Sequence, residues 1–428
     1  MIPRALTATL LRLSRGFPVV VVTGPRQSGK TTLVRAAFPE KPYVTLEDPD
    51  VRQYAAEDGR GFLAGYPEGA IFDEVQRSPD LLSYLQGVVD ADRRPGRFIL
   101  TGSQNFALSH VISQSLAGRA GVAQLLPLSA AELDAAGLLA PEVDACLFRG
   151  GYPELWRRPL DPRDWFAAYV ATYLERDVRD LTAVRDLVVF QRFLRLCAAR
   201  TGQLLNLSSL AVDAGISQST ATAWLGILET GYIVFRLAPH FANFGKRLIK
   251  APKLYFHDPG LAAFLLGIQS PQQLNTHAAR PALFETLIVG EFLRAESNRG
   301  LPSNLYFWRD STGNEVDVLR DEAGVLRPVE IKSGQTVAGD MLRGLLKWRD
   351  LAGEPTGEPW LVFGGEGESV RRDVRVMGWR ALLNCLEALQ AAGPGEGPAA
   401  EALLADYRDD PEPTAFTALD ADDFPAQG

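Results

Sequence analysis

The sequence of 428 residues contains few of the residues that build disulfide frameworks and zinc sites, with three Cys and four His. Cys146, Cys197 and Cys385 are odd in number and far apart, which favours reduced thiols buried as small hydrophobic side chains. The four His show no spacing typical of metal ligands. A fold held together by disulfides or by zinc is therefore not expected.

Long apolar runs are also absent. No run of about 18 apolar residues occurs, so no membrane span is predicted. The N-terminal segment MIPRALTATLLRLSRGF has arginines spread through it and no small-residue cleavage site, which indicates an amphipathic helix and not a signal peptide. With 46% apolar and 22% charged residues, we expect a soluble, cytoplasmic chain without a membrane partner. Its length predicts roughly two to four domains.

A basic excess is missing as well, since the net charge is −8. Nine acidic residues and one arginine follow residue 390, so this tail carries the whole excess and residues 1–390 sum to zero. A neutral body with local basic patches is compatible with DNA binding. The tail is rich in Ala, Pro and Gly, and we expect it to be mostly disordered.

The most specific local motif that is present is GPRQSGKTT, at residues 24–32. It follows the β-branched run 19–22 and precedes a helical stretch, which is the context of a phosphate-binding P-loop and makes an ordinary turn the weaker alternative. Its glycines let backbone amides face phosphate oxygens, while Lys30 would reach the β- and γ-phosphates and Thr31 would bind Mg²⁺. The residues predicted to bind ATP are Gly24, Pro25, Arg26, Gln27, Ser28, Gly29, Lys30, Thr31, Thr32 and Ser103.

An acid pair follows the next apolar strand, in the segment GAIFDEVQR. Asp73 would hold the Mg²⁺ shell and Glu74 would polarise the attacking water, although a solvated acid pair is the alternative. A third strand, RFILT, is followed by Ser103, whose hydroxyl is suited to sensing the γ-phosphate or orienting water, unless it belongs to a plain polar turn. These residues predict ATP hydrolysis with ATP and Mg²⁺ as cofactors.

A single arginine, Arg119 in the segment SLAGR, stands beside a small Ala-Gly step. It would stabilise transition-state charge on the nucleotide of a neighbouring subunit. The alternative is an exposed arginine at a helix end that satisfies carbonyl groups. The catalytic role requires a homo-oligomer, most naturally a ring.

A helix-turn-helix is predicted in residues 202–237. Two short helices with apolar stripes are joined by Gly215 and Ile216, and Ser217 is the expected N-cap of the second. Two strands follow, and the basic segment between them, which ends at Lys253, resembles a wing with cations facing phosphates. Winged helices also bind other proteins, so DNA remains one of two partner classes. The candidate DNA contacts are Gln218, Ser219, Thr222, Lys246, Arg247 and Lys250.

Carboxylates and a lysine gather on predicted strands near the C-terminus. Asp317 and the Glu330-x-Lys332 pair would lie on adjacent strands, where the acids would share Mg²⁺ and the lysine would position water for phosphodiester attack. A preceding helix offers Glu285 and Glu291, and the second fits an accessory acid. The set Glu291, Asp317, Glu330 and Lys332 resembles the PD-(D/E)xK nuclease signature, while charged groups on an exposed hairpin are the competing interpretation.

Several segments of the chain are shared with a known family: GPRQSGKTT, IFDEVQR, FILTGSQ, SLAGR, LLPLSAAEL, RGGYPELW and YVATYLERDV. They resemble the bacterial and archaeal AAA-type ATPases that carry a C-terminal domain of unknown function. The resemblance covers about residues 1–390. It implies an AAA-type ATP-hydrolysing core, a winged helix, and a C-terminal portion similar to restriction-endonuclease folds.

We therefore expect an α/β chain with a doubly wound P-loop core followed by a helical and winged-helix module and a mixed α/β, endonuclease-like domain. The predicted ranges are 1–150, 151–270 and 271–390, with an acidic disordered tail at 391–428. The expected function is Mg²⁺-dependent ATP hydrolysis coupled to binding or remodelling of DNA, branched DNA included. The alternatives are an ATP-gated protein-interaction switch without nucleic acid and an ATP-regulated, metal-dependent nuclease.

Overall fold

A computed structural model describes all residues except 1, 104–114, 175–185, 241–249, 354–355 and 392–428. Residues 1–390 form one compact unit, and residues 392–428 are not among the described ones. The tail, together with the prediction made for it, therefore lies outside the described residues.

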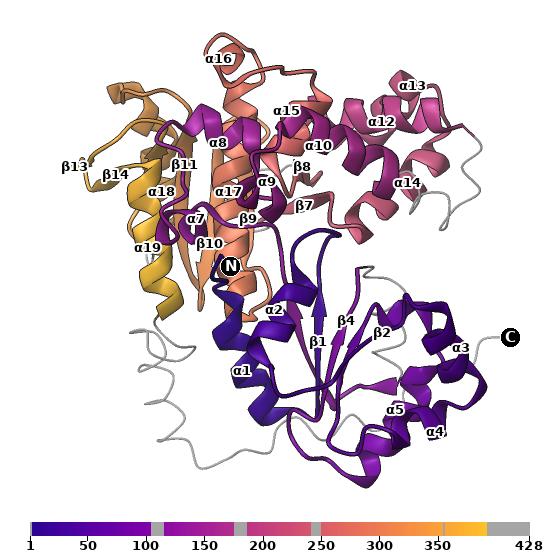
Figure 1. Cartoon of the computed structure of the whole chain (residues 1–428). Coiled ribbons are helices and arrows are strands. Elements are labelled where there is room, and N and C mark those ends of the chain that lie inside the picture. The colour runs from indigo at the N-terminus through magenta and orange to yellow at the C-terminus, as the bar shows by residue number, and fades with distance from the viewer. Residues whose placement is uncertain (1, 104–114, 175–185, 241–249, 354–355, 392–428) are drawn as a thin grey trace, which may run out of the picture. The chain divides into compact units, whose positions relative to one another are not determined.

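A parallel sheet forms the N-terminal part of this unit (Figure 1). In the described residues its strands follow the order β2-β3-β4-β1-β5 and all neighbours pair in parallel. The strands are β1 (Val19–Thr23), β2 (Tyr43–Thr45), β3 (Ile71–Asp73), β4 (Phe98–Thr101) and β5 (Ala120–Gln124). The predicted α/β fold with a parallel sheet is confirmed.

Helices cover both faces of this sheet because the side chains of β1 alternate between two apolar clusters. Val19 and Val21 pack with Leu85, while Val20 packs with Leu33 on the other face. Figure 1 shows α1 and α2 on one side of the sheet and α3, α4 and α5 on the other. The elements are α1 (Leu6–Gly16), α2 (Lys30–Ala37), α3 (Pro49–Glu57), α4 (Gly59–Ala64), η1 (Val75–Arg77) and α5 (Leu81–Ala91).

A helical segment follows the parallel sheet. Its first helix begins with a capping box, in which Ser129 and Glu132 satisfy each other's backbone N–H groups. The elements are α7 (Ala130–Ala135), α8 (Val143–Arg149), α9 (Pro153–Arg157), α10 (Pro162–Tyr169), the π-helical η2 (Val170–Leu174) and α12 (Leu187–Ala199).

The predicted pair of short helices lies at α13 (Leu207–Ala214) and α14 (Gln218–Thr230). Gly215 ends α13 in the left-handed conformation, which glycine adopts at little cost, and the side chain of Ser217 caps α14. The strands β6 (Gln203–Leu204), β7 (Val234–Pro239) and β8 (Lys253–Phe256) pair antiparallel in the order β6-β8-β7.

The C-terminal part adds a helix, a meander of three strands and a further layer of helices. Its helical elements are α15 (Pro259–Leu265), α16 (Pro271–Leu274), α17 (Arg280–Arg299), η3 (Gly339–Leu342), α18 (Arg343–Ala352) and α19 (Trp379–Ala391). Its strands are β9 (Leu305–Arg309), β10 (Glu315–Glu322), β11 (Val325–Lys332), β12 (Trp360–Phe363), β13 (Glu368–Arg371) and β14 (Val374–Gly378).

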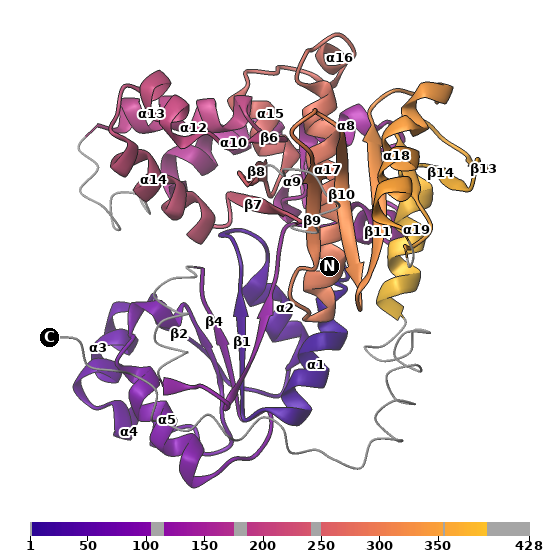
Figure 2. The same cartoon turned by 180° about the vertical axis from the view of Figure 1, so that it is seen from behind.

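Strands predicted in two separate modules belong to one sheet, because β7 pairs in parallel with β9. Across this seam Ala238 is in register with Tyr306, and the backbone N–H of His240 donates to the carbonyl of Phe307 at 2.7 Å. Among the described residues this sheet has the order β13-β14-β12-β11-β10-β9-β7-β8-β6. Figure 2 shows β7, β9, β10 and β11 side by side.

Candidate functional site

The loop between β1 and α2 has the backbone geometry of a phosphate-binding loop. Gly24 has φ +142°, and a Cβ there would lie 2.1 Å from the carbonyl oxygen of Leu125. Gly29 has φ +92° and directly precedes α2. Both positions require glycine, so the loop can turn its backbone N–H groups toward a ligand at the N-terminus of α2.

Lys30 and Ser28 place polar atoms inside this loop. Lys30 is buried, and its Nζ donates to the carbonyl oxygens of Gly24 at 3.0 Å and Pro25 at 2.8 Å. The side chain of Ser28 is fully buried, and its Oγ has no hydrogen-bond partner among the described residues. A phosphate in the loop would offer acceptors to both groups.

Asp73 lies at the carboxyl end of β3, next to the loop. Its Oδ2 accepts hydrogen bonds from Thr31 Oγ1 at 2.9 Å and from the Tyr43 hydroxyl at 2.6 Å, and its Oδ1 accepts one from Thr101. Burial and Asp73 raise the pKa of Tyr43, which keeps that hydroxyl protonated as a donor. The hydroxyl of Thr31 and the carboxylate of Asp73 are the oxygen donors that Mg²⁺ prefers, so this pair fits the ion.

Glu74 occupies an unusual backbone conformation, with φ +57°. This left-handed region is unfavourable for a residue with a side chain. Its carboxylate accepts hydrogen bonds from Ser103 Oγ at 3.0 Å and from the side-chain amide of Gln76, which also donates to Ser103 at 3.1 Å. The structure therefore brings the predicted water-activating acid and the predicted γ-phosphate sensor into direct contact.

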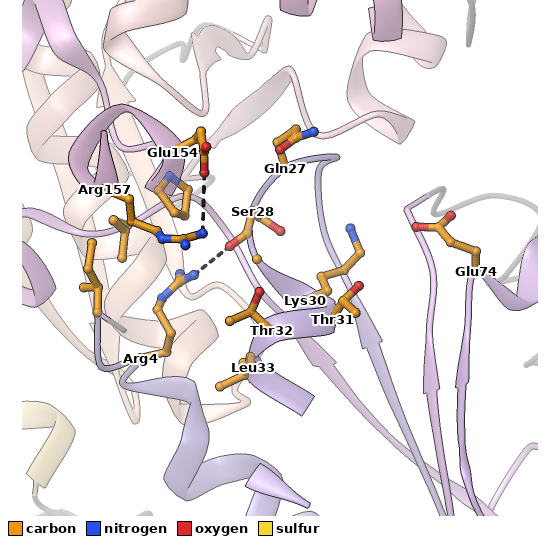
Figure 3. Close-up of a pocket in the computed structure, with 14 residues that line it drawn as sticks. Arg4, Gln27, Ser28, Lys30, Thr31, Thr32, Leu33, Glu74, Glu154 and Arg157 are labelled. Atoms are coloured by element: carbon orange, nitrogen blue, oxygen red, sulfur yellow. Dashed lines mark hydrogen bonds and ion pairs between the residues drawn. The ribbon is translucent and has the colours of Figure 1, made fainter. Parts of the chain in front are cut away.

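A cavity of about 280 Å³ opens beside the loop (Figure 3). Arg4 closes one side of it, donating to the carbonyl oxygens of Ser28 at 2.8 Å and Leu126 at 2.7 Å and pairing with Glu132 at 3.0 Å. Figure 3 shows Arg4 and Arg157 on one side of the loop and Glu74 on the other. The lining residues are Ile2, Arg4, Gln27, Ser28, Gly29, Lys30, Thr31, Thr32, Leu33, Glu74, Leu128, Pro153, Glu154 and Arg157.

Several polar residues of this site were not among those predicted from the sequence. Tyr43 lies in no motif, and Gln76 lies in the segment IFDEVQR but was given no role there; both become apparent only when β2 and η1 are placed beside β3. Arg4 reaches the cavity from the segment before α1, and Arg157 reaches it from the end of α9. An arginine near the N-terminus gives no signal that distinguishes it from a surface charge.

Arg119 lies away from this cavity. It directly precedes β5, whose last residue pairs with the last residue of β1, so it is at the opposite end of the sheet from the loop. Its guanidinium pairs with Asp90 through two hydrogen bonds of 2.7 and 2.9 Å, which lower the pKa of that carboxyl. Within its own chain, Arg119 does not contribute to the nucleotide site.

The candidate DNA contacts are placed as follows. Gln218, Ser219 and Thr222 are exposed in the first turns of α14, and Lys250 is exposed before β8. Lys246 and Arg247 lie outside the described residues. The expectation that Lys253 faces phosphate is wrong, because its side chain is buried among carboxylates.

Three of the four predicted nuclease-like residues meet at one end of β10 and β11. Asp317 Oδ2 accepts the backbone N–H of Ile331 at 2.8 Å, and Lys332 pairs with Glu330. Burial and then the charge of Asp317 raise the pKa of Glu330 to about 8. Its Oε2 is buried without a hydrogen-bond partner in the described part of the chain.

The prediction that Glu291 joins this cluster is wrong. Glu291 pairs with Arg294 at 2.7 Å and accepts the backbone N–H of Ala130 at 2.9 Å, on the opposite side of α17. Glu285, one and two-thirds turns earlier, reaches the cluster instead, because residues six apart point to different sides of a helix. Burial and the charge of Asp317 raise its pKa to about 7.

Residues 16–134 match a family model described as an AAA domain, and residues 141–272 and 280–382 match two models described as domains of unknown function, DUF8612 and DUF4143. A Mycobacterium bovis protein titled Uncharacterized protein Mb2031c is 32% identical over 336 residues, which cover 78% of this chain and 74% of that protein. Rv2008c of Mycobacterium tuberculosis matches with the same values. The chain belongs to the family of these mycobacterial proteins.

The AAA domain of this family member contains the parallel sheet, the loop at 24–29 and the acid pair described above. Its nucleotide-site geometry thus lies within a P-loop ATPase domain. Among solved structures, the Walker-type ATPase PABY2304 of Pyrococcus abyssi aligns with a TM-score of 0.44 and 18% identity, over 62% of this chain and 96% of that chain. None of the helices within the described ranges combines the length and hydropathy needed to cross a bilayer.

Proposed function

We propose that this chain hydrolyses ATP with Mg²⁺ and uses the reaction to control residues 151–390. The observation that carries the proposal is the convergence at the carboxyl ends of β1 and β3. There the loop, the Thr31–Asp73 contact of 2.9 Å and the Glu74–Ser103 contact of 3.0 Å lie beside one cavity. Binding groups, a metal-holding pair and a general base are the parts that phosphoryl transfer to water requires.

In this proposal the loop residues change partners when ATP binds. Lys30 leaves the carbonyl oxygens of Gly24 and Pro25 and pairs with the β- and γ-phosphates, which are stronger acceptors. Glu74 leaves Ser103 and Gln76 and accepts a proton from the attacking water, while Ser103 donates to the γ-phosphate. Thr31 and Asp73 would hold Mg²⁺, which would supply positive charge beside the phosphates.

Steady-state hydrolysis and equilibrium ATP binding test this assignment. We expect Lys30→Ala to weaken ATP binding by about tenfold or more, because it removes a charge-assisted contact. Glu74→Gln should keep ATP binding and lower hydrolysis by about 10² or more, because it removes only the base. Glu47→Gln, a change at an exposed residue, is the matched control. Full hydrolysis by Glu74→Gln would contradict the role given to Glu74.

We further propose that the nucleotide state reaches the C-terminal half through direct contacts. The Tyr232 hydroxyl, in the turn after α14, donates to Thr23 Oγ1 at 3.0 Å, one residue before the loop begins. Ser297 on α17 donates to the carbonyl oxygen of Gln124 at the end of β5 at 2.8 Å. Both contacts touch the loop end of the sheet, where binding of a nucleotide changes the local charge.

Two fold interpretations accompany this proposal. The order α12, β6, α13, α14, β7, β8 supports a winged helix. The order α17, β9, β10, β11, α18, β12 supports an endonuclease-like fold in the C-terminal part. Each interpretation rests on element order and strand pairing, and neither assigns an activity by itself.

DNA is the partner that we propose for the winged helix. The exposed polar side chains of Gln218, Ser219 and Thr222 at the start of α14 support this, since recognition helices contact bases near their N-termini. Helices α13 and α14 contain no Lys or Arg. Affinity would therefore depend on the basic segment with Lys246, Arg247 and Lys250, and would be strongly salt-dependent.

The double variant Lys246→Glu/Arg247→Glu tests the DNA proposal. We expect the double variant to bind single-stranded, duplex and branched DNA more weakly than the wild type at low salt. The difference in affinity should shrink at high salt, because the release of counterions from DNA then contributes less to binding. Fluorescence anisotropy over a salt series measures this, and Lys347→Glu, at an exposed lysine on α18, is the control. Equal affinity of the double variant and the wild type at low salt would remove the proposal.

A protein partner is the second candidate, and one observation favours it. Val212 on α13 is 77% exposed although it is apolar, and α13 and α14 carry two acidic residues and no basic residue. Such a surface suits a protein better than a polyanion. ATP hydrolysis that responds to none of the three DNA forms would support this alternative. In either case, the oligomer in which Arg119 acts on a neighbouring nucleotide remains our proposal.

A further inference from the structure

The ammonium group of Lys253 lies among three carboxylates that come from two other elements. Its Nζ is 2.9 Å from Glu285 Oε1 on α17, 2.5 Å from Glu315 Oε1 on β10 and 3.7 Å from Asp317 Oδ1 on the same strand. The side chain of Lys253 is 3% exposed. Nothing in the sequence around this lysine distinguishes it from the basic residues that precede it.

The surroundings of Lys253 keep it charged. Burial alone would lower its pKa, but the carboxylates of Asp317, Glu285 and Glu315 outweigh burial and raise it. The ammonium also lies over the ring of Phe307, 5.6 Å from the ring centroid. An ammonium carries three N–H donors, and two carboxylates here lie within hydrogen-bond distance of it.

These acids do not fit a divalent metal while Lys253 is present. A metal would need several carboxylate oxygens to converge on one point at distances close to 2 Å. Here the ammonium takes that point between Glu285 and Asp317, and a second ammonium, that of Lys332, pairs with Glu330. Accordingly, within the ranges that the structure describes, no group of three or more His, Cys, Asp or Glu residues is arranged to hold a metal ion.

We propose that Lys253 is the built-in cation of this carboxylate cluster, and that residues 271–390 therefore act without a catalytic metal and do not cut phosphodiester bonds. The proposal concerns a site separate from the ATP site, and it stands whether or not the chain hydrolyses ATP.

The contacts of β8 indicate a structural role for the built-in cation. Lys253 and Tyr255 project from the same face of β8, and the Tyr255 hydroxyl donates to the same Glu285 oxygen at 2.5 Å. Two side chains of β8 thus hold one carboxylate of α17. The cluster therefore joins the strands after the helix-turn-helix to the helix that begins the C-terminal part, a structural role that needs a permanent charge.

Manganese binding to the full-length protein, without nucleotide, tests the proposal. Bound Mn²⁺ is measured by electron paramagnetic resonance for the wild type and for Asp317→Asn. We expect the two proteins to bind equal amounts, since any weak binding at Thr31 and Asp73 is common to both. One Mn²⁺ per chain that is bound by the wild type and lost in Asp317→Asn would overturn the proposal, as would wild-type nicking of a plasmid that Glu330→Ala abolishes.

A variant at Lys253 tests directly whether this lysine takes the place of a metal ion. Lys253→Met leaves the acids without their cation, so we expect a lower melting temperature, a new Mn²⁺ site and a rise of several degrees on adding Mn²⁺. The new site should disappear in Lys253→Met/Asp317→Asn, and Lys347→Met should behave as the wild type. A folded Lys253→Met that gains no Mn²⁺ would overturn the proposal. If Lys253→Met does not fold, Lys253→Arg is used instead, because it keeps the positive charge. Binding of Mn²⁺ at Asp317 in Lys253→Arg would overturn the proposal.

Discussion

At the scale of single residues, Glu330 makes the stability of the fold depend on pH. Burial and Asp317 raise its pKa from 4.5 to about 8. An acid whose pKa is higher in the folded state stabilises the fold fully below about pH 4.5, and this contribution is lost as the pH rises through about 8. Relative to Glu330→Gln, which cannot ionise, the wild type should lose on the order of 3 kcal/mol of unfolding free energy between pH 5 and pH 8.

Denaturant unfolding at several pH values measures this difference. The comparison with Glu330→Gln is needed because His257 changes the stability with pH in the opposite direction to Glu330. Its burial and the charge of Arg294 lower its pKa to about 3, so its contribution is lost as the pH falls through 6.5 toward 3. Glu47→Gln, at an exposed position, should keep the wild-type profile. Parallel profiles for the wild type and Glu330→Gln would contradict the assignment.

Residue types in a local pattern could be predicted, but long-range contacts could not. The loop glycines, Lys30, Thr31, Asp73 and Glu74 lie together at one end of the parallel sheet, where the motifs predict them. The choice between Glu285 and Glu291 depends on which side of α17 faces β10, and both sides of that helix are buried. Lys253 was grouped with a basic segment because its partners lie 32 to 64 positions away in sequence.

At the scale of elements, the predictions succeeded where short-range chemistry decides. Strands β1, β3 and β4 lie at the β-branched or apolar runs from which they are predicted. The turn between α13 and α14 follows from Gly215 in the left-handed conformation and from Ser217, whose side chain accepts the backbone N–H of Thr220 at 3.1 Å. Each of these signals acts within about four residues, which is why sequence alone reveals it.

The pairing of strands that are far apart in the sequence could not be predicted from such short-range signals. The parallel pairing of β7 and β9 joins residues almost 70 positions apart through only two registered pairs. No turn residue fixes this register, and the polar and apolar pattern of either strand is compatible with an edge position. The predicted modules were consequently described as separate, whereas their strands share one sheet.

At the scale of the whole molecule, Tyr232 follows α14 and contacts Thr23 beside the phosphate-binding loop, so it is positioned to connect the loop to α13 and α14. We expect Tyr232→Phe to bind ATP with nearly wild-type affinity, because the hydroxyl contacts Thr23 and not the cavity. The hydrogen bond is worth about 1 kcal/mol, so the fold should persist. Addition of a non-hydrolysable ATP analogue should change amide exchange in α13 and α14 of the wild type and much less in the variant.

Hydrogen exchange followed by mass spectrometry measures this effect. Tyr84→Phe, at a tyrosine that is 42% exposed on α5, is the control and should respond as the wild type does. An equal nucleotide-dependent change in the wild type and Tyr232→Phe would show that the signal travels by another route, such as the contact between Ser297 and Gln124.

The seam between β7 and β9 also decides where the gene can be divided. A fragment that starts near residue 271 would keep β9 but lose β7, and with it the backbone partner of Phe307. The apolar strand Leu305–Arg309 would then become an open sheet edge, and Glu285 and Asp317 would lose the lysine between them. Such a fragment is a poor choice for expression. A fragment that begins at Asp186, directly before α12, keeps the whole sheet and its buried lysine on one polypeptide.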